Sequence, residues 1–149
     1  IFNNVHTSFF TDYSRVGTHT FRHMNGYNNF LQRGLPLGWK HGSDGDQYRV
    51  GLNTFNKTNL ITKLSFGERR EGEETITNDP YESYPHFKIG PFPSGTVTKT
   101  KFISGDLQWW WKPHISLMAG LRWLDSDKDG QEFSLQIGFD IYYPNSFKL

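Results

Sequence analysis

The sequence predicts an all-β fold, an antiparallel transmembrane β-barrel with about six strands in these 149 residues. Three observations predict it. Apolar and polar residues alternate along several stretches, which is the period of a strand with one apolar and one polar face. The clearest stretch, Phe133–Tyr143, alternates for eleven residues. A globular strand usually ends after about 5–6 residues, whereas a tilted strand needs about 9–11 to cross a bilayer. Long and short connections also alternate along the chain, as they do in outer-membrane barrels.

The composition excludes several classes of protein. There is no cysteine, so neither a disulfide framework nor thiolate chemistry is available. The formal net charge is +1, from 16 basic and 15 acidic residues, which gives no reason to expect a nucleic-acid partner. The sequence contains no run of about 18 apolar residues, so it predicts no transmembrane helix. Aromatic residues are frequent, at 17% of the chain.

The strand pattern divides the chain into six stretches. They are Ser8–Val16, Gln47–Phe55, Asn59–Arg70, Val97–Lys112, Ile115–Leu124 and Phe133–Tyr143. The connections after the first, third and fifth are Gly17–Gly45, Glu71–Thr96 and Asp125–Gln131, and those after the second and fourth are Asn56–Thr58 and Pro113–His114. We expect residues 1–149 to form one barrel segment of three hairpins, the C-terminal part of a longer barrel, with long loops 17–45 and 71–96 outside the cell.

The alternation also predicts which side chains meet lipid. The apolar positions expected to face outward are Ile103, Leu107, Leu117, Leu121, Leu135, Ile137 and Phe139. The alternate positions Asp106, Gln108, Arg122, Gln136 and Asp140 are expected to face the lumen. Aromatic residues near the strand ends, Trp109, Trp111, Trp123 and Tyr143, are expected to form the girdles at the two membrane surfaces. A soluble antiparallel sandwich also has one apolar face per strand, and it remains the alternative fold.

The first long loop holds the candidate binding residues. They are Arg33, Trp39, Lys40, His41, Asp44 and Asp46, all within fourteen residues. Basic side chains can pair with glycan carboxylates, aspartates can accept from sugar hydroxyls, and an indole can stack on a sugar face. The same loop can instead fold into the lumen as a plug, with Arg33 or Arg49 paired to Asp44 or Asp46. Both interpretations stay open at the level of sequence.

No motif in the sequence indicates catalysis or a resident metal. His19 and His23 have the spacing of a helical metal site, but their surroundings lack a helical pattern. Asp125, Asp127 and Asp129 begin like a calcium loop, yet the twelfth position is Gln136 instead of glutamate. We therefore expect a solvated acidic hairpin loop, no cofactor and no enzymatic activity.

Several motifs resemble the Wzi-like capsule assembly family of outer-membrane barrels. The motifs are D-Y-x-R at Asp12–Arg15, T-F-x-H at Thr20–His23, R-G-x-P-L-G at Arg33–Gly38 and G-S-D-x-D at Gly42–Asp46. Weaker likenesses follow in E-R-R-E-G-E at Glu68–Glu73 and F-P-S-G-T-V at Phe92–Val97. The family's barrel has many more strands than six, so the resemblance implies that this chain is a C-terminal portion.

The resemblance implies a location in the bacterial outer membrane and a non-enzymatic role in binding or anchoring surface polysaccharide. Its partners would then be outer-membrane lipid, the polysaccharide, and the strands or chains that complete the barrel. Two other functions remain open from the residues alone. One is a porin-like or structural barrel subunit of an envelope complex, and the other is a soluble β-sandwich that binds carbohydrate through its tryptophans and tyrosines.

Overall fold

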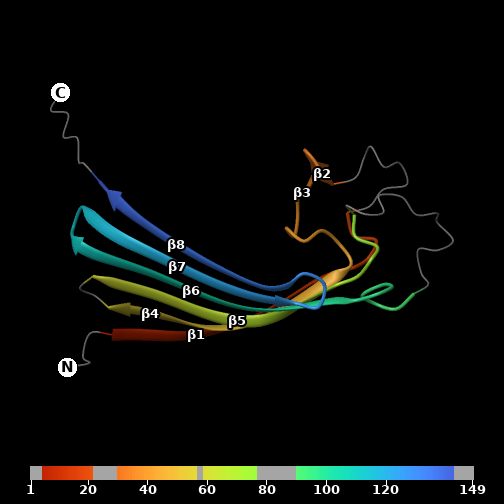
Figure 1. Ribbon diagram of the computed structural model, residues 1–149, viewed down its shortest axis with the longest axis horizontal. Helices are drawn as coiled ribbons and strands as arrows, with labels where there is room; N and C mark the ends of the chain where they lie inside the picture. The colour runs from red at the N-terminus through yellow and green to blue at the C-terminus, as the bar shows by residue number, and fades with distance from the viewer. Residues whose placement is uncertain (1–4, 22–29, 57–58, 77–89, 143–149) are drawn as a thin grey trace.

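The computed structural model describes residues 5–21, 30–56, 59–76 and 90–142, and in these ranges the chain is all β (Figure 1). The strands are β1 Val5–Val16, β2 Leu31–Gln32, β3 Leu35–Pro36, β4 Gly45–Asn56, β5 Leu60–Glu71, β6 Thr98–Lys112, β7 Ile115–Ser126 and β8 Gly130–Ile141. Six of them form one antiparallel sheet in the order β1-β4-β5-β6-β7-β8. Strands β2 and β3 form a separate small hairpin.

The register of the sheet separates the side chains into an apolar face and a polar face. Residues that are Cα partners lie on the same face, so one row across the sheet runs Phe9, Leu52, Leu64, Gly105, Leu121, Leu135. The neighbouring row on the opposite face runs Phe10, Gly51, Ser65, Ser104, Arg122, Ser134. Because side chains alternate with a period of two, the same division holds along each strand.

All seven residues predicted to face lipid share the apolar face, and the residues predicted to face a lumen share the other. The seven apolar side chains are all exposed, with exposed fractions from 38% at Leu107 to 74% at Phe139. Among the described residues, Ile76 is the one buried large hydrophobic side chain, and it lies outside the sheet. The six strands therefore enclose no hydrophobic core of their own.

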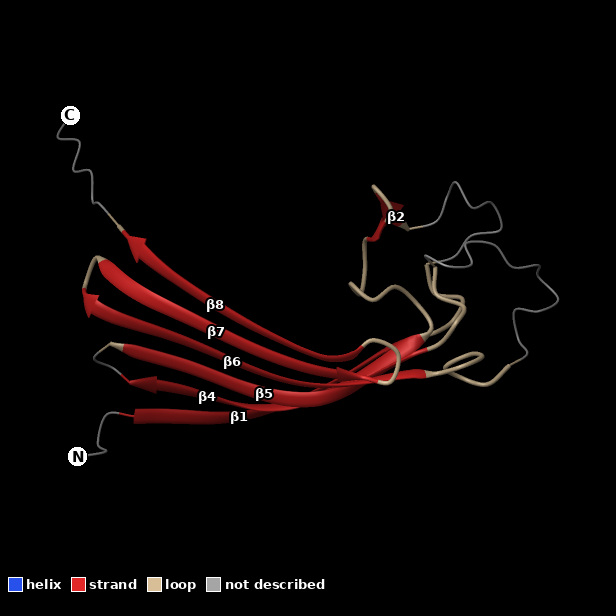
Figure 2. Cartoon of the chain, viewed as in Figure 1, coloured by secondary structure: helices blue, strands red, loops and turns tan. Residues whose placement is uncertain are grey.

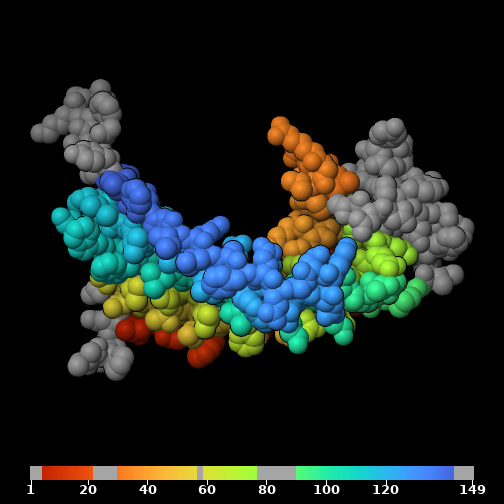
Figure 3. Space-filling model, viewed as in Figure 1, coloured from red at the N-terminus to blue at the C-terminus, as the bar shows by residue number. Residues whose placement is uncertain are grey.

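The sheet is strongly curved along its strands, and the β2–β3 hairpin stands over its concave side at one end (Figure 2). We call this end, where the chain leaves β1 and β5, the loop end. The opposite end carries the connections β4–β5 and β6–β7, and we call it the turn end. The space-filling view shows the hollow between the sheet and the hairpin (Figure 3). No helix in the described ranges is long and apolar enough to cross a membrane.

The six predicted strands are confirmed, but one connection is shorter than predicted and another contains a small hairpin. The predicted loop Asp125–Gln131 contracts to residues 127–129, because Asp125 pairs with Gln131 and Ser126 with Gly130. A three-residue turn suffices there because Gly130 adopts a φ of 76° and Ser126 Oγ accepts hydrogen bonds from the Lys128 and Asp129 amides. The third hairpin therefore lacks a long loop.

The first long loop contains regular structure that the sequence pattern does not indicate. It contains the β2–β3 hairpin, closed by Arg33 and Gly34 with φ values of 53° and 78°. Two consecutive positive φ angles are those of a type I′ turn, whose twist matches paired strands. Tyr143, predicted for the girdle, lies outside the described residues.

Candidate functional site

A groove on the polar face, under the end of the first long loop, is the candidate site. Its volume is about 670 Å³, and its floor comes from β1, β4, β5, β6 and β7. Trp39, Lys40 and His41 form the wall that the loop contributes. The loop can approach the sheet this closely because residue 45 is glycine, since a Cβ at Gly45 would stand 2.9 Å from the Trp39 ring. We call this cavity the polar groove.

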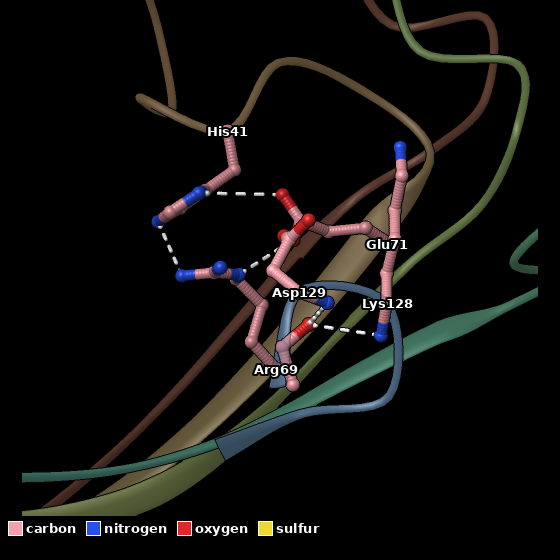
Figure 4. Close-up of polar contacts among 6 residues, drawn as sticks. His41, Arg69, Glu71, Lys128 and Asp129 are labelled. Carbon is pink, nitrogen blue, oxygen red and sulfur yellow. Dashed lines mark hydrogen bonds and ion pairs between the residues drawn. The ribbon is translucent and has the colours of Figure 1, made fainter. Parts of the chain in front are cut away.

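His41 attaches the groove's wall to β5 through a closed set of polar contacts (Figure 4). Arg69 donates through Nη1 to His41 Nε2 at 3.0 Å and through Nε to Glu71 Oε2 at 2.8 Å. The third side of the triangle is the 3.3 Å contact between His41 Nδ1 and Glu71 Oε1. Because arginine can only donate, Nε2 must accept and Nδ1 carries the proton, which fixes the histidine as the Nδ1–H tautomer.

Glu71 is held in its charged form by this arrangement. It is the last residue of β5 and lies toward the loop end, beyond the row that contains Trp123. Burial raises the pKa of Glu71, but the hydrogen bond from His41 and the positive charge of Arg69 more than offset it, so the pKa lies below its ordinary value. The ring of Trp39 lies edge-on to that of His41 at 5.0 Å between centroids, so the triangle also positions the indole.

The charges in the groove are partly paired and partly available. Arg49 is bound to Asp12, with Nε 2.7 Å from Oδ2. Lys40, Lys63 and Arg122 also line the groove, and the described residues place no carboxylate within ion-pair distance of them. Asp106 is the one other carboxylate among the groove's lining residues in the described ranges. The described part of the groove thus offers three cations without an ion-pair partner, one carboxylate and an indole.

The groove continues along the polar face toward both ends of the sheet. Toward the turn end, Lys63 and Asp106 also border a hollow of about 830 Å³, where Gly120 and Gly138 leave the floor open. Toward the loop end, His41 and Arg69 also border a polar pocket of about 300 Å³ beside the β7–β8 turn.

Of the six predicted site residues, the structure brings Trp39, Lys40 and His41 into the groove. Arg33 lies at the exposed tip of the β2–β3 hairpin and borders a shallow pocket of that hairpin alone. Asp44 and Asp46 are buried, with exposed fractions of 0% and 3%. Their carboxylates accept hydrogen bonds from other residues of the chain, so in this structure neither is available to a ligand.

Asp44 joins its own loop segment to three others at the loop end. Its carboxylate accepts hydrogen bonds from Thr18 Oγ1 at 2.7 Å, from the Ser94 amide at 2.9 Å and hydroxyl at 2.5 Å, and from the Glu74 amide at 3.2 Å. Its backbone carbonyl accepts from the Gly72 amide at 2.8 Å. Asp44 therefore serves the packing of the loops in this structure.

Asp46 lies on the apolar face, on the opposite side of the sheet from the groove. Arg70 donates to both of its carboxylate oxygens, at 2.8 and 2.5 Å, and Tyr13 donates through its hydroxyl at 3.0 Å. This bidentate pair joins neighbouring strands at the loop end of the sheet. The pairing expected for a structural role is thus present, although with Arg70 in place of Arg33 or Arg49.

The acidic residues that resemble a calcium loop are spread over a strand and a turn. Asp125 lies in β7, paired with Lys101 and Gln131, while Asp127 and Asp129 lie in the turn. In the described ranges no group of three or more His, Asp or Glu side chains is arranged to hold an ion. His23, of the predicted histidine pair, lies outside those ranges.

Sequence reasoning missed two residues that reach the groove from β5, Lys63 and Arg69. Their place on the polar side of the alternating strand was visible in the sequence. The loop that covers them was not, because the contact between His41 and Arg69 joins residues that are far apart in the chain.

Comparison with known proteins finds no family model that matches the chain, and neither a curated protein nor a solved structure matches it.

Proposed function

We propose that this chain is part of an outer-membrane β-barrel of the capsule-assembly type, and that its polar groove holds surface polysaccharide without catalysing a reaction. The observation that carries the proposal is the division of one sheet into an exposed apolar face and a polar face with a groove. Lipid would cover the apolar face, and the polar face would line the lumen.

The strands have the length that a bilayer requires. Five of the six sheet strands contain 12 residues and β6 contains 15. At a rise of about 3.3 Å per residue, 12 residues extend about 40 Å, which spans about 28 Å at a tilt of about 45°. The apolar band of an outer-membrane barrel is about 25 Å tall. The apolar face is bounded by Trp109 near the turn end and Trp123 toward the loop end, as girdles would be.

The edges of the sheet call for further strands. Within the described ranges, β1 has no partner beyond β4, and β8 has none beyond β7. In hydrocarbon an unpaired backbone group costs several kcal/mol, so an open edge is excluded. Because outer-membrane barrels have at least about eight strands, we do not expect these six strands to close into a barrel by themselves. Additional antiparallel strands would complete the barrel between β8 and β1.

The groove offers the chemistry that an acidic polysaccharide needs. Trp39 can stack on the apolar face of a sugar ring, and Lys40, Lys63 and Arg122 can pair with its carboxylates. Asp106 can accept from sugar hydroxyls. These contacts arise from the loop and from three strands, so a bound glycan would lie against the polar face.

The experiment that tests this proposal removes two groove cations and compares a charge-matched control. The double variant Lys40→Gln, Arg122→Gln should reduce polysaccharide retained on the cell surface severalfold. The control, Lys99→Gln with Lys101→Gln, removes the same charge from the apolar face, on the other side of the sheet from the groove, and should leave retention unchanged. Folded protein is followed by heat-modifiable gel migration in detergent. Wild-type retention by folded Lys40→Gln, Arg122→Gln protein would refute a glycan site in this groove.

A further inference from the structure

A second site lies at the turn end of the sheet, where a bulge interrupts the β6–β7 ladder. Trp110 pairs with Ser116 and Lys112 with Ile115, so Trp111 is an extra residue in β6. Strict alternation would have left Lys112 on the polar face, together with Trp110. The bulge instead places Lys112 opposite Ile115, which pairs with Ile141 on the apolar face.

The bulge therefore puts a cation among aromatic and aliphatic side chains at the rim of the apolar face. Lys112 Nζ lies 5.4 Å from the centre of the Trp111 ring, within the range of a cation–π contact. Trp109 and Trp111 are exposed to 40% and 67%. Lys112 is exposed too, and the described residues place no carboxylate within ion-pair distance of it.

A cavity of about 480 Å³ adjoins this cation. It is lined by Phe55, Asn56, Asn59, Leu60, Trp110, Trp111, Lys112 and Pro113. A backbone hydrogen bond of 2.8 Å from the Trp110 amide to the Asn59 carbonyl joins β6 to the residue before β5 beside it. Among these lining residues there is one lysine and no carboxylate, and the indoles can only donate. The cavity is thus suited to an anion attached to an apolar group.

We propose that this cavity binds the phosphate of an anionic glycerophospholipid, with the acyl chains lying along the apolar face. The proposal rests on the proposed membrane location of the sheet and adds a specific lipid contact to it. Lysine extends its charge to the headgroup level while its methylenes stay on apolar surface, and tryptophan favours the same depth. The row next to the cavity, with Leu60, Trp109, Leu117 and Phe139, supplies the surface for the acyl chains.

The test uses tryptophan quenching by brominated lipids. In a Trp39→Phe, Trp123→Phe background, the remaining tryptophans are the three at the turn end. The protein purified in detergent is reconstituted with dibrominated phosphatidylglycerol or dibrominated phosphatidylcholine, each diluted in the unbrominated phosphatidylcholine. We expect phosphatidylglycerol to bind about fivefold more tightly, because one lysine near a membrane surface contributes about 1 kcal/mol.

Lys112→Gln should abolish this preference, whereas Lys101→Gln, the same change at the loop end of the same strand, should retain it. Equal quenching by the two lipids in the parent protein, or a preference that survives Lys112→Gln, would overturn the lipid site while leaving the membrane location intact. Absence of quenching by either lipid would overturn the membrane location and the site together.

Discussion

The substitution Ile137→Arg distinguishes a lipid-facing surface from one that meets water. Ile137 lies on β8, on the apolar face, in the row of Ala119 and Leu107, and is 72% exposed. In water, a substitution at so exposed a position changes stability by about 0.5 kcal/mol or less. Near the middle of a bilayer, an arginine on the lipid face of a barrel costs about 2–4 kcal/mol. The two environments therefore predict different outcomes for the same variant.

The measurement is the free energy of unfolding in lipid vesicles, obtained from denaturant titrations of the wild type and the variant. A loss of about 2–4 kcal/mol corresponds to a roughly 30- to 1,000-fold change in the folding equilibrium. Gln136→Arg is the matched control, since it introduces the same side chain one residue away on the polar face. Equal free energies of unfolding for the two variants would refute the assignment of the faces.

Three further predictions concern the loops and the residues that hold them. Because the chain has no cysteine, Arg33→Cys and His114→Cys each provide a single site for labelling. An impermeant thiol reagent added to intact cells should label Arg33→Cys and leave His114→Cys unlabelled. Labelling of His114→Cys alone would mean that the topology is inverted. Asp44→Ala should leave the Ser94 amide without its acceptor and cost about 1–3 kcal/mol, with faster proteolysis of the loops, whereas Asp129→Ala in the exposed turn should change neither. Because the pKa of Glu71 is lowered on folding, its contribution to stability is present above its unfolded pKa and is lost as pH falls through the folded pKa. The difference in unfolding free energy between wild type and Glu71→Gln should therefore shrink on acidification. A difference that grows would contradict the His41–Arg69–Glu71 contacts.

The strands and their faces could be predicted from the sequence because each depends on a local pattern. Alternation in Phe133–Tyr143 and its neighbours specifies which side chains share a face, and the register confirms that division. The bulge at Trp111 could not be predicted in the same way. Three consecutive tryptophans followed by Lys112 fit a regular strand as well as a bulged one. Only the pairing of Lys112 with Ile115 shows that the strand is bulged.

The site was harder to predict because it depends on contacts between distant segments. Side chains suited to glycan binding in the first long loop identified Trp39, Lys40 and His41, which line the groove. Asp44 and Asp46 are predicted on the same grounds, but they are buried away from the groove. What separates them is Ser94, fifty residues from Asp44, and Arg70, twenty-four from Asp46. Their partners lie in other loops and strands, so neighbouring sequence carries no signal for them.

The proposal that one face of this sheet meets lipid and the other meets water can be tested with single spin labels placed at each position of β7 from Leu117 to Leu124, in protein reconstituted into vesicles. Collisions with oxygen, which concentrates in lipid, should peak at 117, 119, 121 and 123, whereas collisions with a water-soluble nickel chelate should peak at 118, 120, 122 and 124. Oxygen and nickel accessibilities that rise and fall together along the strand would contradict it.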